Sequence, residues 1–142
     1  MNKPCYNKLM HLPSNTLFEK LRQKHQLNLI LLHGSQVSGK FIHANSDVDI
    51  AVYGSQNSFN LLNFSNDVEE ILPEQKIDIA DITHADPLFL YTVVSRSKLL
   101  AGSEVDYQKL KTKASHRYRN YQPYLEKERQ FVIERLNSYV AT

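Results

Sequence analysis

The stretch His33-Gly-Ser-Gln-Val-Ser-Gly-Lys-Phe-Ile-His-Ala-Asn-Ser-Asp-Val-Asp-Ile-Ala-Val52 decides the fold of this chain. It follows the apolar run Leu29 to Leu32, turns at Gly34-Ser35 and ends in an alternating segment that carries Asp47 and Asp49. Side chains alternate in direction along a strand. Both carboxylates therefore face one way, and the apolar side chains between and after them face the core.

The paired carboxylates of Asp47 and Asp49 indicate a cation site. Residues two apart on one strand lie about 7 Å from each other, so two charged acids there repel unless a cation lies between them. Hard divalent ions such as Mg²⁺ prefer oxygen ligands. The segment therefore predicts Mg²⁺ together with a phosphate.

The Gly34-Ser35 turn is a candidate phosphate-binding site beside the predicted cation site. A glycine lets backbone amides approach an anion, and the N-terminus of a short following helix would offer free N–H groups to phosphate. The dipeptide alone is typical of any turn. A strand, this turn, a spacer and Asp-x-Asp on a second strand together place a phosphate cradle beside a metal site, which is what nucleotidyl transfer needs. His33 could also touch a phosphate, although its expected role is structural.

A third strand is predicted at Lys76 to Ile82, and it carries two more acids. Asp78 and Asp81 lie on opposite faces of an undistorted strand, so one of them at most can face the same site as Asp49. A carboxylate there could act as a base or as a metal ligand near the attacking hydroxyl.

Length and composition limit the number of domains, the kinds of partner and the location that we expect. The chain has 142 residues, a formal net charge of +2 and a single cysteine. This length predicts one domain, with a core at about residues 15–102 and a helical segment at 103–140. The weak basic excess gives no reason to expect direct nucleic-acid binding. One cysteine fits a reducing compartment, and without an apolar leader or a run of about 20 apolar residues the expected location is cytoplasmic, with no membrane contact.

Helices are predicted around these strands. Thr16 to Glu19 has the capping-box form, so a first helix should run to about Gln26, and Ser58 to Leu72 shows a second apolar stripe. Asp86-Pro87 predicts a third helix start, with Asp as N-cap and Pro at the first position. Leu88 to Val94 is apolar on nearly every side and predicts a buried helix.

The chain changes character after Gly102. From Glu104 onward apolar residues recur at mostly helical spacing and Pro123 interrupts them, which predicts one kinked helix or two in series. Tyrosines alternate with basic side chains here. We expect a helix packed across the sheet with a solvated basic face. The alternative is a docking surface for another protein, because Tyr and Arg are enriched at interfaces.

Gly34-Ser35 followed by Ser46-Asp47-Val48-Asp49-Ile50 resembles the signature of the DNA polymerase β-type nucleotidyltransferase superfamily, in particular its minimal nucleotidyltransferase (MNT) proteins. The resemblance continues through 76–82 to the helix start at 86–88. The spacer is one residue longer than the family pattern. Val37-Ser38 stands where an arginine is often found, which leaves Lys40 as the nearby cation.

This resemblance implies an α/β fold of the polymerase β-like palm type, a mixed β-sheet flanked by helices and followed by a C-terminal helical segment. It selects Asp78 as the third carboxylate, so that two Mg²⁺ ions would be held by Asp47, Asp49 and Asp78. The phosphates of ATP would lie on Gly34, Ser35, Lys40 and Ser46.

Small MNT proteins are similar to the antitoxin half of HEPN–MNT toxin–antitoxin pairs. The resemblance implies an enzyme that transfers AMP from ATP to a tyrosine of a HEPN ribonuclease toxin, neutralising it within a complex. Two alternatives stay open: a small-molecule nucleotidyltransferase working with a helical partner subunit, and an antitoxin that acts by binding alone.

Overall fold

The computed structural model describes residues 15–34, 37, 47–73 and 75–140. The elements are, in order, α2 (Asn15–Lys24), β1 (Leu29–His33), β2 (Val48–Tyr53), α4 (Leu61–Ile71), β3 (Ile77–Asp81), α5 (Pro87–Ser95), β4 (Lys98–Ala101) and α6 (Glu104–Val140).

The four strands form one mixed sheet in the order β3-β2-β1-β4. β1 is antiparallel to both β2 and β4, and β2 is parallel to β3. The predicted mixed α/β sheet is therefore confirmed. β4 was absent from the prediction because its four residues, Lys-Leu-Leu-Ala, are too short to show an alternating pattern.

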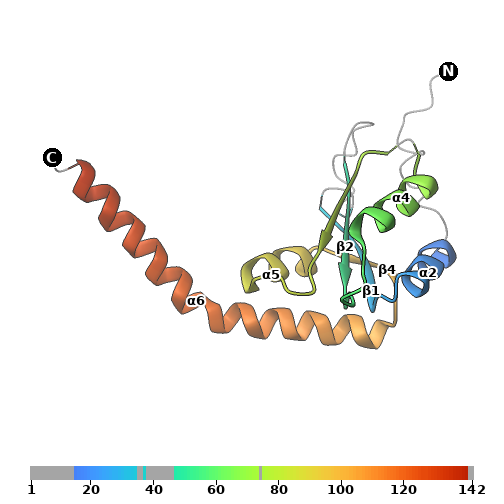
Figure 1. The fold of residues 1–142 in the computed structure, drawn as a ribbon. Helices are drawn as coiled ribbons and strands as arrows, with labels where there is room; N and C mark the ends of the chain where they lie inside the picture. Colours follow the sequence, from blue (N-terminus) through green and yellow to red (C-terminus); the bar gives the residue numbers. More distant parts are fainter. Residues whose placement is uncertain (1–14, 35–36, 38–46, 74, 141–142) are drawn as a thin grey trace, which may run out of the picture.

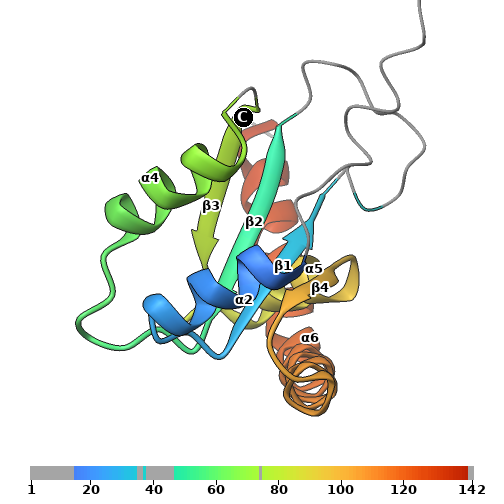
Figure 2. The same ribbon diagram turned by 90° about the vertical axis from the view of Figure 1, so that its right-hand side faces the viewer.

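Helices cover both faces of the sheet, as the two views in Figures 1 and 2 show. α2 and α4 lie on one face, where Phe18 and Phe64 pack with Ile50 and other alternate residues of the central strands. α5 and the first part of α6 lie on the other face. Val48, Ile50 and Val52 all belong to the α2/α4 core. The predicted alternation along β2 is thus confirmed.

The helix starts follow side-chain caps. The Asp86 carboxylate accepts a hydrogen bond from the Phe89 backbone N–H at 2.9 Å and Pro87 is the first residue of α5, as predicted. α4 begins at Leu61, later than the predicted Ser58, because the Asn60 side chain caps it by accepting from the Asn63 N–H. The expectation of a fully buried α5 was wrong in part, since Phe89 is 42% exposed.

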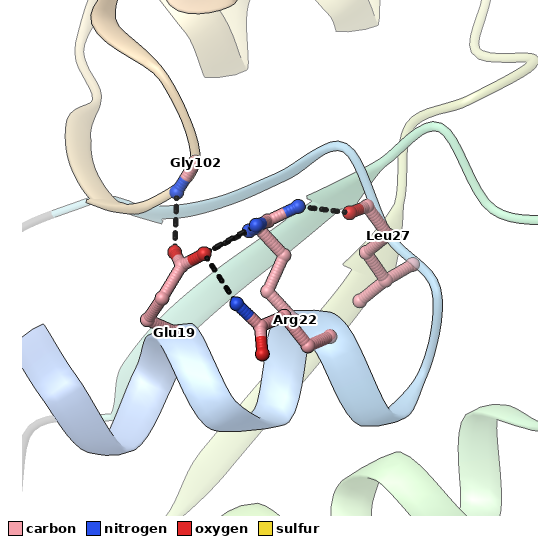
Figure 3. A network of polar contacts seen from close by, with 5 residues as sticks. Glu19, Arg22, Leu27 and Gly102 are labelled. Atoms are coloured by element: carbon pink, nitrogen blue, oxygen red, sulfur yellow. Dashed lines mark hydrogen bonds and ion pairs between the residues drawn. The ribbon is translucent and has the colours of Figure 1, made fainter.

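α2 is joined to the turn between β4 and α6 by a polar network around Glu19 (Figure 3). One carboxylate oxygen of Glu19 accepts from the Gly102 backbone N–H at 3.1 Å, and the other accepts from Arg22. Arg22 in turn donates to the Leu27 carbonyl at 3.1 Å. The capping-box pattern assigned the Glu19 carboxylate to the start of the first helix. In the structure it instead connects α2 to the turn before α6.

α6 is a single helix with Pro123 inside it, and Figure 1 shows that it bends part-way along. Its first half packs through Tyr107, Leu110 and Ala114 against α5 and the sheet. Residues 126–140 are all exposed. The prediction of a helix packed across the sheet therefore holds for the first half only. None of the described helices, α6 included, has the apolar length that crossing a membrane would need.

Candidate nucleotide site

Three polar side chains lie in a row across the central strands. His33 at the end of β1 pairs with Asp49 of β2, and Asp49 pairs with Asp78 of β3. Residues directly opposite one another on paired strands project from the same face. The row lies on the α5/α6 face, because Ile50 and Ile79 beside it belong to the opposite core. Register therefore brings together two acids that are far apart in the sequence.

The surroundings of the row disfavour the charged forms of both Asp49 and His33. Partial burial raises the pKa of Asp49, and the nearby carboxylates of Asp78 and Asp47 raise it further, while His33 opposes them. Burial lowers the pKa of His33 against the pull of the two aspartates. Asp47 lies just before β2 with one carboxylate oxygen 3.9 Å from Lys76 Nζ. The carboxylates of Asp47 and Asp78 thus both lie close enough to Asp49 to repel its charge, which is the condition that a bound cation relieves.

Gly34 follows β1 and presses against Asp49. Its φ is +80°, and a Cβ at this position would lie 2.2 Å from Oδ2 of Asp49. A side chain there would be strained by backbone conformation and would collide with the carboxylate. The Val37 N–H donates to the Gly34 carbonyl at 3.3 Å, and Val37 is helical. The glycine therefore lets the turn pass directly over an acid of the row.

The remaining predicted phosphate contacts, Ser35, Lys40 and Ser46, lie outside the described residues. Among the residues that are described, no three His, Cys, Asp or Glu side chains already surround one point as a metal site. Asp47, Asp49 and Asp78 supply oxygen donors and an excess of negative charge, which is the donor chemistry that Mg²⁺ prefers.

Asp81 has a different place, as the alternation predicted. Its carboxylate accepts from the hydroxyls of Ser55 at 2.7 Å and Thr83 at 2.6 Å, and from the Thr83 N–H at 3.0 Å. These bonds tie the end of β3 to the loop after β2. Sequence reasoning did not find that His33 lies opposite Asp49 or that Lys76 lies near Asp47. The position of His33 could have revealed its place in the row. It lies two residues after Leu31, so both side chains project from the same face of β1.

A mixed sheet with helices on both faces, opposed carboxylates on two parallel strands and a glycine turn beside them defines a nucleotidyltransferase of the palm class. The family model for polymerase beta nucleotidyltransferases matches residues 15–106. The chain belongs to this family.

The chain is similar to the protein adenylyltransferase MntA of Shewanella oneidensis strain MR-1, with 29% identity over 129 residues, 89% of this chain and 88% of the relative. It is also similar to a chain in a crystal structure of a toxin–antitoxin with AMP-PNP, with 26% identity and a TM-score of 0.65 over 87% of this chain and 98% of that one. A third likeness is to a chain in the structure of a tri-AMPylated S. oneidensis HEPN toxin with its MNT antitoxin. There the identity is 24% and the TM-score 0.59 over 86% of this chain and 94% of that one, and the likeness is one of fold.

Proposed function

We propose that this chain is an antitoxin and a protein adenylyltransferase, which transfers AMP from ATP to a tyrosine hydroxyl of a HEPN ribonuclease toxin and thereby neutralises it. The observation that carries the proposal is the Asp49–Asp78 pair on neighbouring strands, with Gly34 held against Asp49. The single cysteine is consistent with a cytoplasmic location.

The roles of the residues follow from their places. Asp47, Asp49 and Asp78 would hold Mg²⁺, which when bound neutralises phosphate charge and lowers the pKa of the attacking hydroxyl. The turn at Gly34 and Ser35 would bind the triphosphate through backbone N–H groups. Lys40 and Ser46 are the further proposed phosphate contacts.

The transfer itself is an exchange of one phosphoester bond for another. The tyrosine oxygen forms a bond to the α-phosphorus of ATP while the bond from that phosphorus to the β-phosphate oxygen breaks, and pyrophosphate leaves. Asp78 is the more exposed carboxylate of the row, and its proposed role is to accept the hydroxyl proton. Asp49 is the less exposed of the two, and its proposed role is to hold Mg²⁺.

The relatives support this acceptor over a small molecule. MntA is a protein adenylyltransferase, and the alignment with it covers 89% of this chain. The toxin–antitoxin structure that aligns with it holds AMP-PNP, an ATP analogue. The HEPN identity of the partner rests on the family resemblance.

The test is intact-mass spectrometry of the protein encoded by the neighbouring gene, which the proposal expects to be a HEPN-type ribonuclease. Co-expression with the wild-type chain should add mass in steps of one AMP, and co-expression with Asp47→Ala, Asp49→Ala should add none. Asp81→Asn is the matched control, because Asp81 lies on the same strand as Asp78 but faces away from the row.

The alternatives give different results. If the neighbour gains no mass and AMP appears on a small hydroxyl compound, the acceptor is a small molecule. If the double variant still silences the ribonuclease, neutralisation works by binding alone, and the claim that AMP transfer causes neutralisation fails.

A further inference from the structure

His33 belongs to the same row as Asp49 and Asp78, although the proposed function assigns it no role. It is the last residue of β1, and its register partner on β2 is Asp49. Opposite residues on paired strands have Cβ atoms about 4.5 to 5.5 Å apart. Because β2 lies between β1 and β3 in the sheet, the imidazole lies beside the Asp49 carboxylate on the side away from Asp78.

The surroundings of His33 differ from those of a histidine with a structural role. His25 is such a residue, since its Nε2 lies 2.7 Å from Oδ2 of Asp67 and its ring packs edge-on against Phe64 with centroids 5.2 Å apart. His33 is half-buried, and within the described ranges its ring interacts electrostatically with the two acids of the row but has no hydrogen-bond partner. Polar groups withdrawn from water usually have such a partner. The ring of His33 therefore has a donor to offer to a bound molecule.

The chemistry of nucleotidyl transfer assigns the two ends of the row to different atoms of ATP. In a displacement at the α-phosphorus, the attacking and leaving oxygens lie roughly in line on opposite sides of the phosphorus. The proposed role of Asp78 is to accept the proton of the attacking hydroxyl, so the acceptor lies at the β3 end of the row. The leaving pyrophosphate then lies at the β1 end, beside His33. Neighbouring strands are about 4.8 Å apart, so the row spans about 10 Å, which is enough for this arrangement.

The sequence around His33 supports this orientation. Gly34 follows it directly, is exposed, and begins the turn that is proposed to bind the triphosphate. Val37 and Ser38 stand where the family pattern often has an arginine. A donor at position 33 would supply a phosphate contact that this arginine would otherwise make. An imidazole has at least one N–H to donate in either charge state.

We propose that His33 is a catalytic residue of the transfer reaction, and that its ring N–H donates a hydrogen bond to the β-phosphate of ATP and to the pyrophosphate as it leaves. The proposal rests on the proposed function and adds a residue to it. When the bond from the α-phosphorus to the bridging oxygen breaks, its electron pair stays on that oxygen. His33 keeps its proton and stabilises the negative charge that develops there, while the hydroxyl proton goes to Asp78.

The experiment compares two variants of His33 in the full chain with a matched control. His33→Leu removes the donor, and His33→Gln keeps an N–H at about the reach of Nε2. His84→Leu is the control, because His84 is exposed and follows the end of β3 that is farther from Asp78. Binding of AMP-PNP and of AMP is measured for each protein in the presence of Mg²⁺. Steady-state transfer of AMP to the neighbouring-gene protein and thermal unfolding are measured on the same samples.

His33→Leu should bind AMP-PNP about tenfold to a hundredfold more weakly, as expected for the loss of a hydrogen bond to a charged group. Its affinity for AMP, which has no β-phosphate, should stay within about twofold of the wild type. Its kcat should fall by at least about tenfold, because the charge on the leaving oxygen develops in the transition state. His33→Gln should recover most of both losses, and His84→Leu should match the wild type.

Three results would overturn the proposal. Equal weakening of AMP-PNP and AMP binding by His33→Leu would show that the histidine acts through packing or through the position of Asp49. Unchanged AMP-PNP affinity and kcat in His33→Leu would show that it does not contact the phosphates. A His33→Gln variant that loses as much as His33→Leu would show that the N–H is not the group that matters.

This role and the proposed function fail in different ways. A loss of AMP-PNP affinity alone in His33→Leu, with no AMP found on the neighbouring protein even with the wild type, would support the role of His33 and refute the protein acceptor. Normal transfer of AMP by His33→Leu would leave the adenylyltransferase activity in place and overturn the role of His33.

Discussion

At the scale of single residues, Gly34 is the position where backbone conformation and the candidate site depend on each other most directly. We predict that Gly34→Ala costs about 1 to 2 kcal/mol of stability, because its φ of +80° disfavours a Cβ. The new methyl group would also displace the Asp49 carboxylate, and a shift of about 1 Å at a reacting group can cost about a hundredfold in rate. Adenylylation kinetics and thermal unfolding measure the two effects.

Gly54→Ala is the matched control for that change. Gly54 has a φ of +82°, and a Cβ there would meet the Asn28 side chain 2.4 Å away, at a turn that contains none of the row. A similar loss of stability with normal kinetics is expected. Equal kinetic losses in both variants would show that Gly34 acts through stability alone.

We expect the negative charge of Asp49 to be required for the reaction and to reduce the stability of the folded state. Its folded pKa is raised above the ordinary 3.8 by burial and by its acidic neighbours. The unfolded state therefore releases the proton first, and stability falls as pH rises from about 3.8 through the folded pKa. We predict that Asp49→Asn is more stable than the wild type at neutral pH, by less than about 1 kcal/mol after solvent screening, and inactive.

Melting curves from pH 3 to pH 8 test this, and the gain of the Asn variant should grow across the window and then level off. Mg²⁺ with AMP-PNP should stabilise the wild type and not the variant. A variant that is less stable than the wild type at neutral pH would contradict the electrostatic account.

Residue patterns predicted much of this local structure. The alternation along β2 placed the acids and the core on opposite faces, and the Asp86-Pro87 pair located the start of α5. The row itself could not be derived from alternation, because Asp49 and Asp78 meet only when β2 and β3 pair in parallel at one register. That register depends on contacts between segments far apart in the chain.

At the scale of elements, the Glu19 network holds α2 to the turn between β4 and α6 (Figure 3). Glu19→Ala would leave the Gly102 N–H and Arg22 without their acceptor. We predict a loss of about 1 kcal/mol. Hydrogen bonding from Arg22 lowers the folded pKa of Glu19 below 4.5, so this stability is complete above pH 4.5 and is lost as pH falls through the folded pKa.

Denaturant titrations of Glu19→Ala and the wild type at pH 7 and pH 3 measure that prediction, and the difference between them should shrink at pH 3. Lys24→Ala is the comparison, because Lys24 forms an exposed ion pair with Asp67 and its loss should matter far less. A pH-independent difference for Glu19 would assign its contribution to packing.

The elements that the sequence did not predict were those with weak patterns. β4 is four residues long, and it becomes a strand because Leu100 and Ala101 complete the α2/α4 core beside β1. The length of α6 was undecided because a proline inside a helix and a proline between two helices leave the same pattern. In both cases tertiary contacts decided what local propensity could not.

At the scale of the whole molecule, the bend of α6 sets the direction of residues 124–140, its distal half, relative to the candidate site. Proline in a helix interior removes one backbone hydrogen bond and kinks the helix. Residues 126–140 are all exposed, so packing against the rest of the described chain does not explain the bend. We therefore attribute it to Pro123. We predict that Pro123→Ala restores the hydrogen bond, stabilises this part of the helix by up to about 3 kcal/mol and straightens it.

A straightened α6 would carry its distal half away from the face that bears Asp49 and Asp78. Small-angle scattering should then show a longer molecule, and hydrogen exchange should slow around residue 123. AMP-PNP affinity should stay unchanged, because the sheet and its carboxylates are untouched. The rate of AMP transfer to the acceptor should fall, since the exposed apolar side chains of the distal half would no longer lie beside the carboxylates to contact it. Unchanged transfer by a demonstrably straighter protein would show that the acceptor reaches the carboxylates without the distal half, and that the bend has no part in the reaction.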